Sequence, residues 1–191
     1  MFAGGSASPF HTRRRPGTVT NLTTVESLPV LVRDGIRLRE VDLADAAALT
    51  ALFQLPEVSK HLDPPPATQA DFSSWIALSL SRRAEGRAAC YTVVDAAGEA
   101  VGLFMALRSD DRDRAEIGFA MAPHLWGTGA FQKAAGVYLD FLFGQWSVKT
   151  LVGKTQVSNA RAMGAMRKLG AVVLEETERN GHAEYVWTIE R

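Results

Sequence analysis

A short glycine-bearing loop, residues 126–131 (WGTGAF), contains the residue types that can bind an anion. Gly127 and Gly129 allow the backbone to turn tightly and to approach a ligand without a Cβ in the way. An amphipathic helix follows the loop, and its first N–H groups have no partner within the helix. Phosphate is the usual anion at such a helix start, although paired glycines also occur in ordinary tight turns. The loop is therefore a candidate phosphate site.

The strand predicted before this loop, residues 115–122, carries one carboxylate that could take part in acid–base chemistry. Bulky apolar residues alternate with small ones along the strand, and Glu116 is the charged residue on the small face. A carboxylate beside a cleft can accept a proton directly or through a water molecule. An ion pair with Arg112 or Arg114 is the structural alternative, and the sequence leaves both open.

Other polar residues give weaker signals. Asn159 precedes a second, shorter helix, where it can cap the helix, bind a ligand or do both. His124 lies just before the loop and titrates in a useful range, but a surface position is the commoner role. The four histidines lack metal-ligand spacing with cysteine or carboxylates, so we expect no metal site.

The elements that must position these residues follow from the periodicity of the apolar residues. A three-stranded antiparallel meander precedes the long helix, and a hairpin over Asn180-Gly181 closes the chain. The predicted strands cover residues 35–39, 88–95, 99–108, 115–122, 149–156, 171–179 and 184–190. The predicted helices cover residues 42–55, 57–62, 68–86, 131–143 and 158–169. This order predicts an α/β (α+β) fold with a mixed, mostly antiparallel central sheet and helices on both faces.

Length and composition fit one soluble domain. The chain has 191 residues, and its 21 basic residues balance its 21 acidic residues, so there is no electrostatic footprint for nucleic acid or an anionic membrane. We expect residues 1–28 to form a flexible extension and residues 29–191 to form a single domain. The lone Cys90 cannot form an internal disulfide and favours a reducing, cytoplasmic location.

Two segments resemble a known family. EIGFAMAPHLWGTGAF, followed by an amphipathic helix, resembles the acetyl-CoA-binding motif of the GNAT acetyltransferases, in the ribosomal-protein N-terminal acetyltransferase-like branch. QVSNARA at 156–162, continued by RKLG at 167–170, resembles a second motif of the same family. Trp126 takes the first position of the loop pattern and Gly129 the central glycine, whereas Phe131 stands where Gly or Ala is usual. The resemblance covers residues 35–190.

The resemblance implies specific contacts for acetyl-CoA as co-substrate. The pyrophosphate would lie on the loop, Asn159 would bind the pantetheine or phosphate end, and the backbone of Met121 and Ala122 would pair with pantetheine. The implied loop contacts are Trp126, Gly127, Thr128, Gly129, Ala130 and Phe131. The first two helices would border the acceptor pocket, so that His61, Phe72 and Trp75 are candidate substrate contacts. The two aromatic residues have a core position as their alternative.

The resemblance also implies the chemistry. The chain would be an acetyl-CoA-dependent N-acetyltransferase that transfers the acetyl group directly, with Glu116 as the base. Many such enzymes use a tyrosine as the acid for the leaving thiolate, and Met166 stands in its place. The acceptor would be a protein N-terminal α-amine or a small-molecule amine, and the protein would be a monomer or a homodimer. A non-catalytic acyl-CoA-binding module is the alternative, and a nucleotide-binding protein ranks below both.

Overall fold

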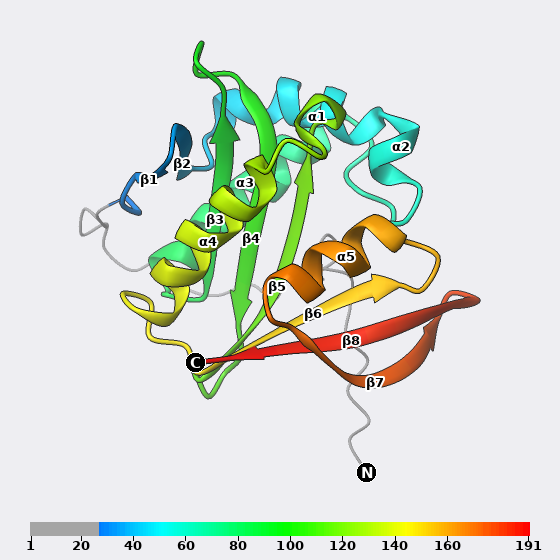
Figure 1. The fold of residues 1–191 in the computed structure, drawn as a ribbon. Helices are drawn as coiled ribbons and strands as arrows, with labels where there is room; N and C mark the ends of the chain where they lie inside the picture. The colour runs from blue at the N-terminus through cyan, green and yellow to red at the C-terminus, as the bar shows by residue number, and fades with distance from the viewer. Residues whose placement is uncertain (1–26) are drawn as a thin grey trace.

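Eight strands form one sheet in the order β1-β2-β3-β4-β5-β6-β8-β7 in the computed structural model, which describes residues 27–191 (Figure 1). The β5–β6 pair is parallel and each other neighbouring pair is antiparallel, which confirms the mixed, mostly antiparallel sheet predicted from the sequence. The strands are β1 Leu31–Arg33, β2 Ile36–Glu40, β3 Ala88–Val94, β4 Ala100–Arg108, β5 Arg114–Met121, β6 Thr150–Gln156, β7 Val172–Arg179 and β8 His182–Glu190.

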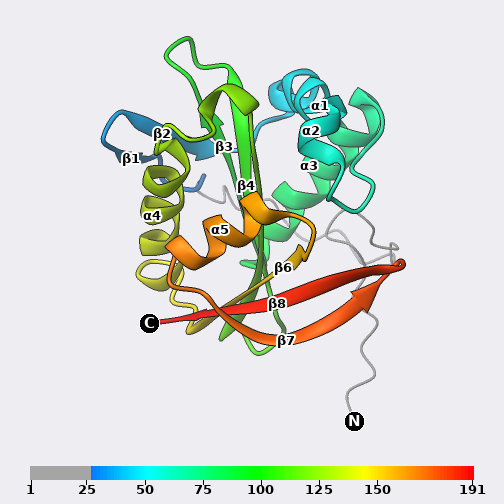
Figure 2. The same cartoon turned by 45° about the vertical axis from the view of Figure 1, so that its right-hand side comes forward.

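Helices cover both faces of the sheet (Figure 2). Helices α1 and α3 pack on one face over a core that includes Leu49, Phe72 and Ile76. Helices α4 and α5 pack on the other face, where Tyr138 and Met166 are buried. The helical segments are η1 Leu43–Asp45, α1 Ala46–Gln54, α2 Pro56–Ser59, α3 Gln69–Ala84, η2 Pro123–Leu125, α4 Ala130–Phe143 and α5 Ala160–Lys168. The two cores meet only through the sheet, so each helical layer has its own apolar interface.

The helix starts follow the capping signals in the sequence. The Thr68 side chain accepts from the Asp71 N–H at 3.2 Å, and the Asp71 carboxylate accepts from the Thr68 N–H at 3.1 Å, which is a capping box. Asn159 caps α5 by accepting from the Ala162 N–H at 3.1 Å. Helix α4 begins differently, because its cap residue is Gly129 in the left-handed conformation, with no side-chain cap.

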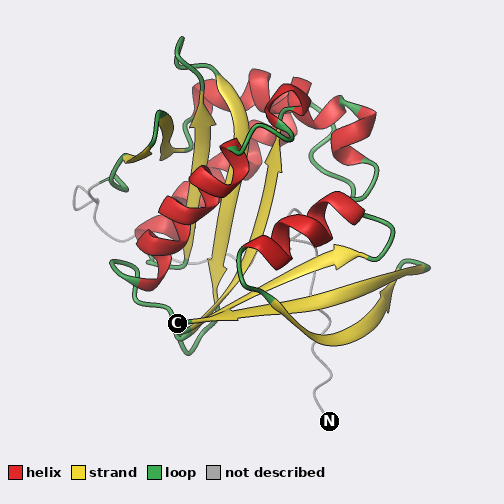
Figure 3. Ribbon diagram, viewed as in Figure 1, coloured by secondary structure: helices red, strands yellow, loops and turns green. Residues whose placement is uncertain are grey.

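Strands β5 and β6 separate part of the way along their length. Their pairing runs from Arg114↔Thr150 to Ile117↔Gly153 and ends there. Strand β6 then stays paired with β8 as far as Gln156, so it follows β8 away from β5 (Figure 3). The remainder of β5 therefore has an open edge in the middle of the sheet.

Two elements differ from the sequence-based expectation. Strand β1 was not predicted, because three residues are too short to show a periodicity; it forms a hairpin with β2 over Asp34 and Gly35, which have φ of 47° and 81°. The short helix expected over residues 57–62 is α2, Pro56–Ser59. Most of the expected extension, residues 1–26, lies outside the described residues; the Leu28 N–H already bonds the Glu40 carboxylate at 3.2 Å.

Candidate functional site

Two neighbouring cavities that share part of their lining lie where β5 and β6 separate. The outer groove, of about 790 Å³, runs between the loop before α4 and the face of α5. The inner cavity, of about 140 Å³, lies deeper between β5, β6 and the end of α1. The residues that line both are His61, Leu62, Phe119, Ala120, Asn159 and Ala162. A ligand in the outer groove can therefore reach a second molecule in the inner cavity.

The loop at the head of the outer groove has the backbone of an anion site. Gly127 and Gly129 have φ of 76° and 84°, and an added Cβ at either position would meet no atom within 4 Å, so the space beside both is open. The Thr128 hydroxyl donates to the Leu125 carbonyl at 2.7 Å and accepts from the Ala130 N–H at 3.3 Å. The next N–H groups in the first turn of α4 have no carbonyl partner within the helix and remain for a ligand.

Basic side chains border the same groove. Lys133, Arg161 and Lys168 line it, against the single carboxylate of Glu57. In the amide orientation that satisfies its neighbours, Gln132 accepts from the Lys168 ammonium and donates to the Gly129 carbonyl, both at 3.3 Å. This contact joins the start of α4 to the end of α5. The charge and the open N–H groups fit a ligand with several phosphates.

Phe131 directs its ring into the core rather than into the loop. The ring centroid lies 4.7 Å from that of Phe119 and 5.9 Å from that of Phe104. These contacts belong to the core on the α4 side of the sheet. The large residue at a position where the family motif has Gly or Ala therefore supports the floor of the groove and leaves the backbone N–H groups exposed.

The open edge of β5 presents the backbone of Phe119 and Met121. The Ala122 N–H bonds the Val101 carbonyl at 2.8 Å and the Ala122 carbonyl accepts from the Leu125 N–H at 3.0 Å, so neither group is free to pair with a cofactor. Backbone groups alternate in direction along an antiparallel strand, so Phe119 and Met121 face the gap. Met121 therefore lies at the open edge as expected, the backbone of Ala122 is held in other hydrogen bonds, and Phe119, which the sequence did not suggest, lies at the same edge.

Trp126 closes part of this edge. Its indole N–H donates to the Met121 carbonyl at 2.9 Å, so that carbonyl already has a partner. The Arg161 guanidinium lies 3.4 Å from the centroid of the Trp126 ring, a cation–π contact between the loop and α5. Trp126 therefore orders the wall of the groove through contacts on both sides.

Glu116 lines the inner cavity and not the outer groove. Across residues 27–191 it forms no ion pair with Arg112 or Arg114, and Arg112 donates instead to the Glu85 carbonyl at 3.3 Å. A second carboxylate, Glu184, lines the same cavity from β8, and burial raises its pKa, partly opposed by Arg179. Lys154 and Arg179 line the same cavity, so its wall carries both carboxylates and cationic groups.

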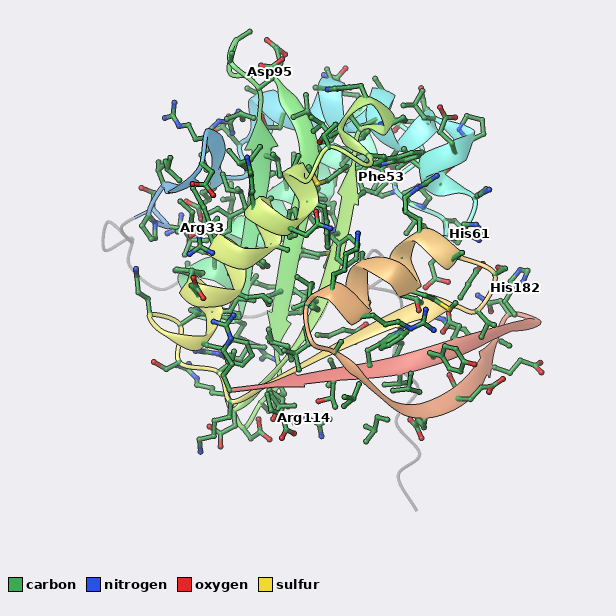
Figure 4. All side chains as sticks on the ribbon, in the orientation of Figure 1. Arg33, Phe53, His61, Asp95, Arg114 and His182 are labelled. Atoms are coloured by element: carbon green, nitrogen blue, oxygen red, sulfur yellow. The ribbon has the colours of Figure 1, made fainter. Side chains whose placement is uncertain are left out.

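The segment after α2 is held against the β6–β8 region by polar contacts. His61 Nδ1 lies 3.2 Å from Gln156 Oε1 and 3.3 Å from Ser158 Oγ, which come 95 and 97 residues later. Asp63 forms an ion pair with Arg179 at 2.7 Å. Figure 4 shows His61 on the segment that follows α2, next to the start of α5. These contacts place an imidazole at the junction of the two cavities.

The other predicted contacts divide between the site and the core. Asn159 lines both cavities while its Oδ1 caps α5, so its amide Nδ2 is the group that remains for a ligand. Phe72 and Trp75 are buried and line neither cavity; they pack with Phe53 between α1 and α3, which is the core alternative that the sequence left open. Phe53, which the sequence did not suggest, lines the inner cavity.

Within the described part of the chain, no cluster of three His, Cys, Asp or Glu side chains is suited to a metal ion. None of the helices there is long and apolar enough to cross a membrane.

Comparison with known proteins gives consistent results. Residues 36–172 match the model of the acetyltransferase (GNAT) domain. An uncharacterized N-acetyltransferase, p20, from Bacillus licheniformis is 23% identical over 145 residues, which is 74% of this chain and 82% of that protein.

Two solved structures show the same fold. One is a Salmonella typhimurium acetyltransferase described as modifying the N-terminal serine of ribosomal protein L7/L12, with a TM-score of 0.76, 16% identity, and coverage of 85% of this chain and 99% of that one. The other is Mycobacterium smegmatis RimJ in complex with CoA-disulfide, with a TM-score of 0.71, 18% identity, and coverage of 86% of each chain.

Proposed function

The chain belongs to the GNAT acetyltransferase family, and from that premise we propose that it transfers an acetyl group directly from acetyl-CoA to a primary amine. The observation that carries the proposal is the pair of neighbouring cavities at the separation of β5 and β6. One cavity has groups that can hold phosphates, and the other has carboxylates that could receive an amine, beside Lys154 and Arg179. Direct transfer requires both molecules to meet, and six residues are common to the two linings.

The outer groove fits acetyl-CoA along its length. The loop and the first turn of α4 would hold the pyrophosphate, with Lys133, Arg161 and Lys168 compensating its charge. The open edge of β5 at Phe119 would pair with the amide groups of pantetheine, as a further strand does. The thioester would then lie beside Asn159 at the junction of the cavities, where a backbone N–H of β5 can polarise its carbonyl.

The inner cavity would hold the acceptor amine. An alkylammonium ion has to lose a proton before its nitrogen can attack, and Glu116 is placed to take that proton, directly or through a water molecule. Cys90 is the single cysteine, is buried in β3 and lines neither cavity, so it offers no covalent intermediate. The amine therefore attacks the thioester itself.

The acceptor belongs to one of two classes, a protein N-terminal α-amine or a small-molecule amine. The relative that acetylates an N-terminal serine shares the fold and makes the first class a natural starting point. The carboxylates of Glu116 and Glu184 serve either class, because both present an ammonium group. Use of acetyl-CoA and a single reduced thiol fit a cytoplasmic protein.

Thermal unfolding with acetyl-CoA, CoA and ATP tests the cofactor. A ligand at about 100 times its Kd stabilises a protein by about 2.7 kcal/mol, which corresponds to about 5 to 10 °C for a chain of this length. We expect that increase with acetyl-CoA and CoA, and none with ATP. Stabilisation by ATP alone would favour a nucleotide-binding protein instead.

Two tryptophan variants test whether the loop is where acetyl-CoA binds and stabilises the protein. Gly129→Trp fills the loop and should abolish the stabilisation by acetyl-CoA. Gly98→Trp is its matched control, because Gly98 also has positive φ, at 87°, and open space, but lies in the β3–β4 turn away from both cavities. Both should lose about 1–2 kcal/mol of stability from the left-handed backbone. Equal acetyl-CoA stabilisation in the two variants would remove the loop from the site.

Release of CoA thiol in the presence of amines tests the reaction. The probes are spermidine and short peptides with a free N-terminal serine or alanine. Thiol release that requires one of these amines supports the transferase. Binding of acetyl-CoA without release by any amine would support the non-catalytic acyl-CoA-binding module, for which Met166 in place of a tyrosine acid is the favouring feature.

A further inference from the structure

We propose that His61 carries a proton from the attacking nitrogen to the leaving sulfur. The proposal rests on the proposed acetyl transfer and adds the group that completes its proton balance. It assigns to His61 a catalytic role beyond the substrate contact expected from the sequence.

His61 lies where the two cavities meet. Of the six residues that line both cavities, His61 is the one with a titratable side chain. Glu116 and Glu184 line only the inner cavity, while Lys133 and Lys168 line only the outer groove. The attacking nitrogen and the leaving sulfur are both bonded to the thioester carbonyl carbon during the transfer, and that carbon would lie at the junction of the two cavities. An imidazole at that junction can reach both atoms.

The contacts of His61 bear on which ring nitrogen carries the proton. Gln156 Oε1 can accept a hydrogen bond and cannot donate one, so its contact with His61 Nδ1 at 3.2 Å fits the tautomer with the proton on Nδ1. Ser158 Oγ, at 3.3 Å from the same atom, can accept as well. Across residues 27–191 no hydrogen bond involves Nε2. In the neutral ring with Nδ1 protonated, Nε2 carries the lone pair that accepts a proton.

The tyrosine acid that related enzymes use is absent from its usual position. Met166 stands where related enzymes place a tyrosine, and it is buried against the inner cavity. Neither of the two cavities described above is lined by a tyrosine or a cysteine. A thiolate that leaves without protonation is the alternative, and a general acid typically accelerates such a step by about 10² to 10⁴-fold.

The step balances as follows. An alkylammonium loses its first proton to Glu116, and its nitrogen then attacks the thioester carbonyl. As the N–C bond forms, the nitrogen gives its second proton to His61 Nε2; as the C–S bond breaks, Nε2 returns that proton to sulfur. The products are the N-acetyl amine and the CoA thiol, and the proton on Glu116 passes to solvent. His61 ends the cycle in its starting form.

Two substitutions at position 61 separate the shuttle from a structural role. In His61→Asn the side-chain amide can still donate to Gln156 but has no group at the place of Nε2. This variant should lower kcat by about 10²-fold with spermidine or the serine peptide, while its acetyl-CoA Kd stays within about twofold. In His61→Ala, added imidazole should restore at least a tenth of the lost activity. His124→Gln is the matched control, since His124 is exposed and lines neither cavity, and it should keep wild-type kcat.

Nitrogen NMR of the histidine rings supplies a measurement that does not depend on turnover. The His61 signal, assigned by its loss in His61→Asn, should show the neutral ring with the proton on Nδ1. The opposite tautomer would overturn the proposal, as would wild-type kcat in His61→Asn or no rescue by imidazole. Failure of the wild type to release CoA thiol with any amine would instead reject the proposed function, and the shuttle with it.

Discussion

Replacement of Phe131 by alanine should weaken the fold and leave acetyl-CoA binding intact. The substitution restores a small residue at a loop position where the related motif has Gly or Ala. Full truncation of a buried Phe to Ala costs about 3–5 kcal/mol, and Phe131 is only half buried. The contacts of its ring with Phe119 and Phe104 also stabilise the fold, as aromatic pairs typically do, and the substitution removes them. We therefore expect a loss of about 2 kcal/mol, or about 4 to 8 °C in Tm.

Two measurements and one control decide this prediction. Denaturant unfolding gives the loss of stability, and titration calorimetry gives the acetyl-CoA Kd, which should change by less than about threefold. Phe143→Ala is the control, because Phe143 is also half buried, packs against the same core and closes the far end of α4. The reasoning would be refuted if Phe131→Ala kept its stability and lost acetyl-CoA affinity by more than about tenfold, since the ring would then belong to the ligand site.

Three further predictions concern titratable groups. Glu116→Gln should lower kcat by about 10² or more while the acetyl-CoA Kd is unchanged; an equal kcat would leave Glu116 as a structural carboxylate. Burial opposes ionisation of Asp45, but hydrogen bonds from Arg39, Asp42 and Thr92 prevail and lower its pKa from 3.8. Asp45→Asn should therefore lower the free energy of unfolding by about 1–3 kcal/mol near neutral pH. The difference in stability from wild type should shrink as pH falls below 3.8 through the folded pKa of Asp45. Urea unfolding at several pH values measures this difference, and a difference that does not change with pH would contradict the prediction. Burial raises the pKa of Cys90 to about 12, so a disulfide reagent should label it only on unfolding, and labelling of the native protein would show that β3 opens.

Much of the fold could be predicted because its elements are long and periodic. Spacing and turn residues predicted a strand at residues 115–122, a helix at residues 131–143 and the Asn-Gly hairpin, and the structure has them as β5 Arg114–Met121, α4 Ala130–Phe143 and the β7–β8 hairpin. The order of elements implied helices on both faces. Strand β1 was missed because Leu31–Arg33 is too short for a period, although Asp34-Gly35 is itself a strong turn signal. The turn residues indicated this hairpin, whereas the hydrophobic pattern did not.

Only part of the site could be predicted from the sequence, because its geometry depends on where β5 and β6 separate. The loop glycines and Asn159 have local signatures, and the structure brings them to one groove. The backbone of Phe119 lies at the open edge because pairing with β6 ends at Ile117, and no residue type in the sequence encodes that point. Likewise His61 meets Gln156 across 95 residues of chain, a contact that no local pattern predicts.

The contacts at Asp63 and His61 have a consequence for synthesis of the protein. Chains fold from the N-terminus as they leave the ribosome, and the antiparallel strands β1 to β5 pair with near neighbours in sequence. The inner cavity, in contrast, needs Arg179 to fix Asp63 and Glu184 to form its wall. The backbone of the loop before α4 can thus form while the 61 residues after Ala130 are still to be made. Both cavities are completed only later, because Arg161 and Lys168 of α5 line the outer groove and Glu184 of β8 lines the inner cavity.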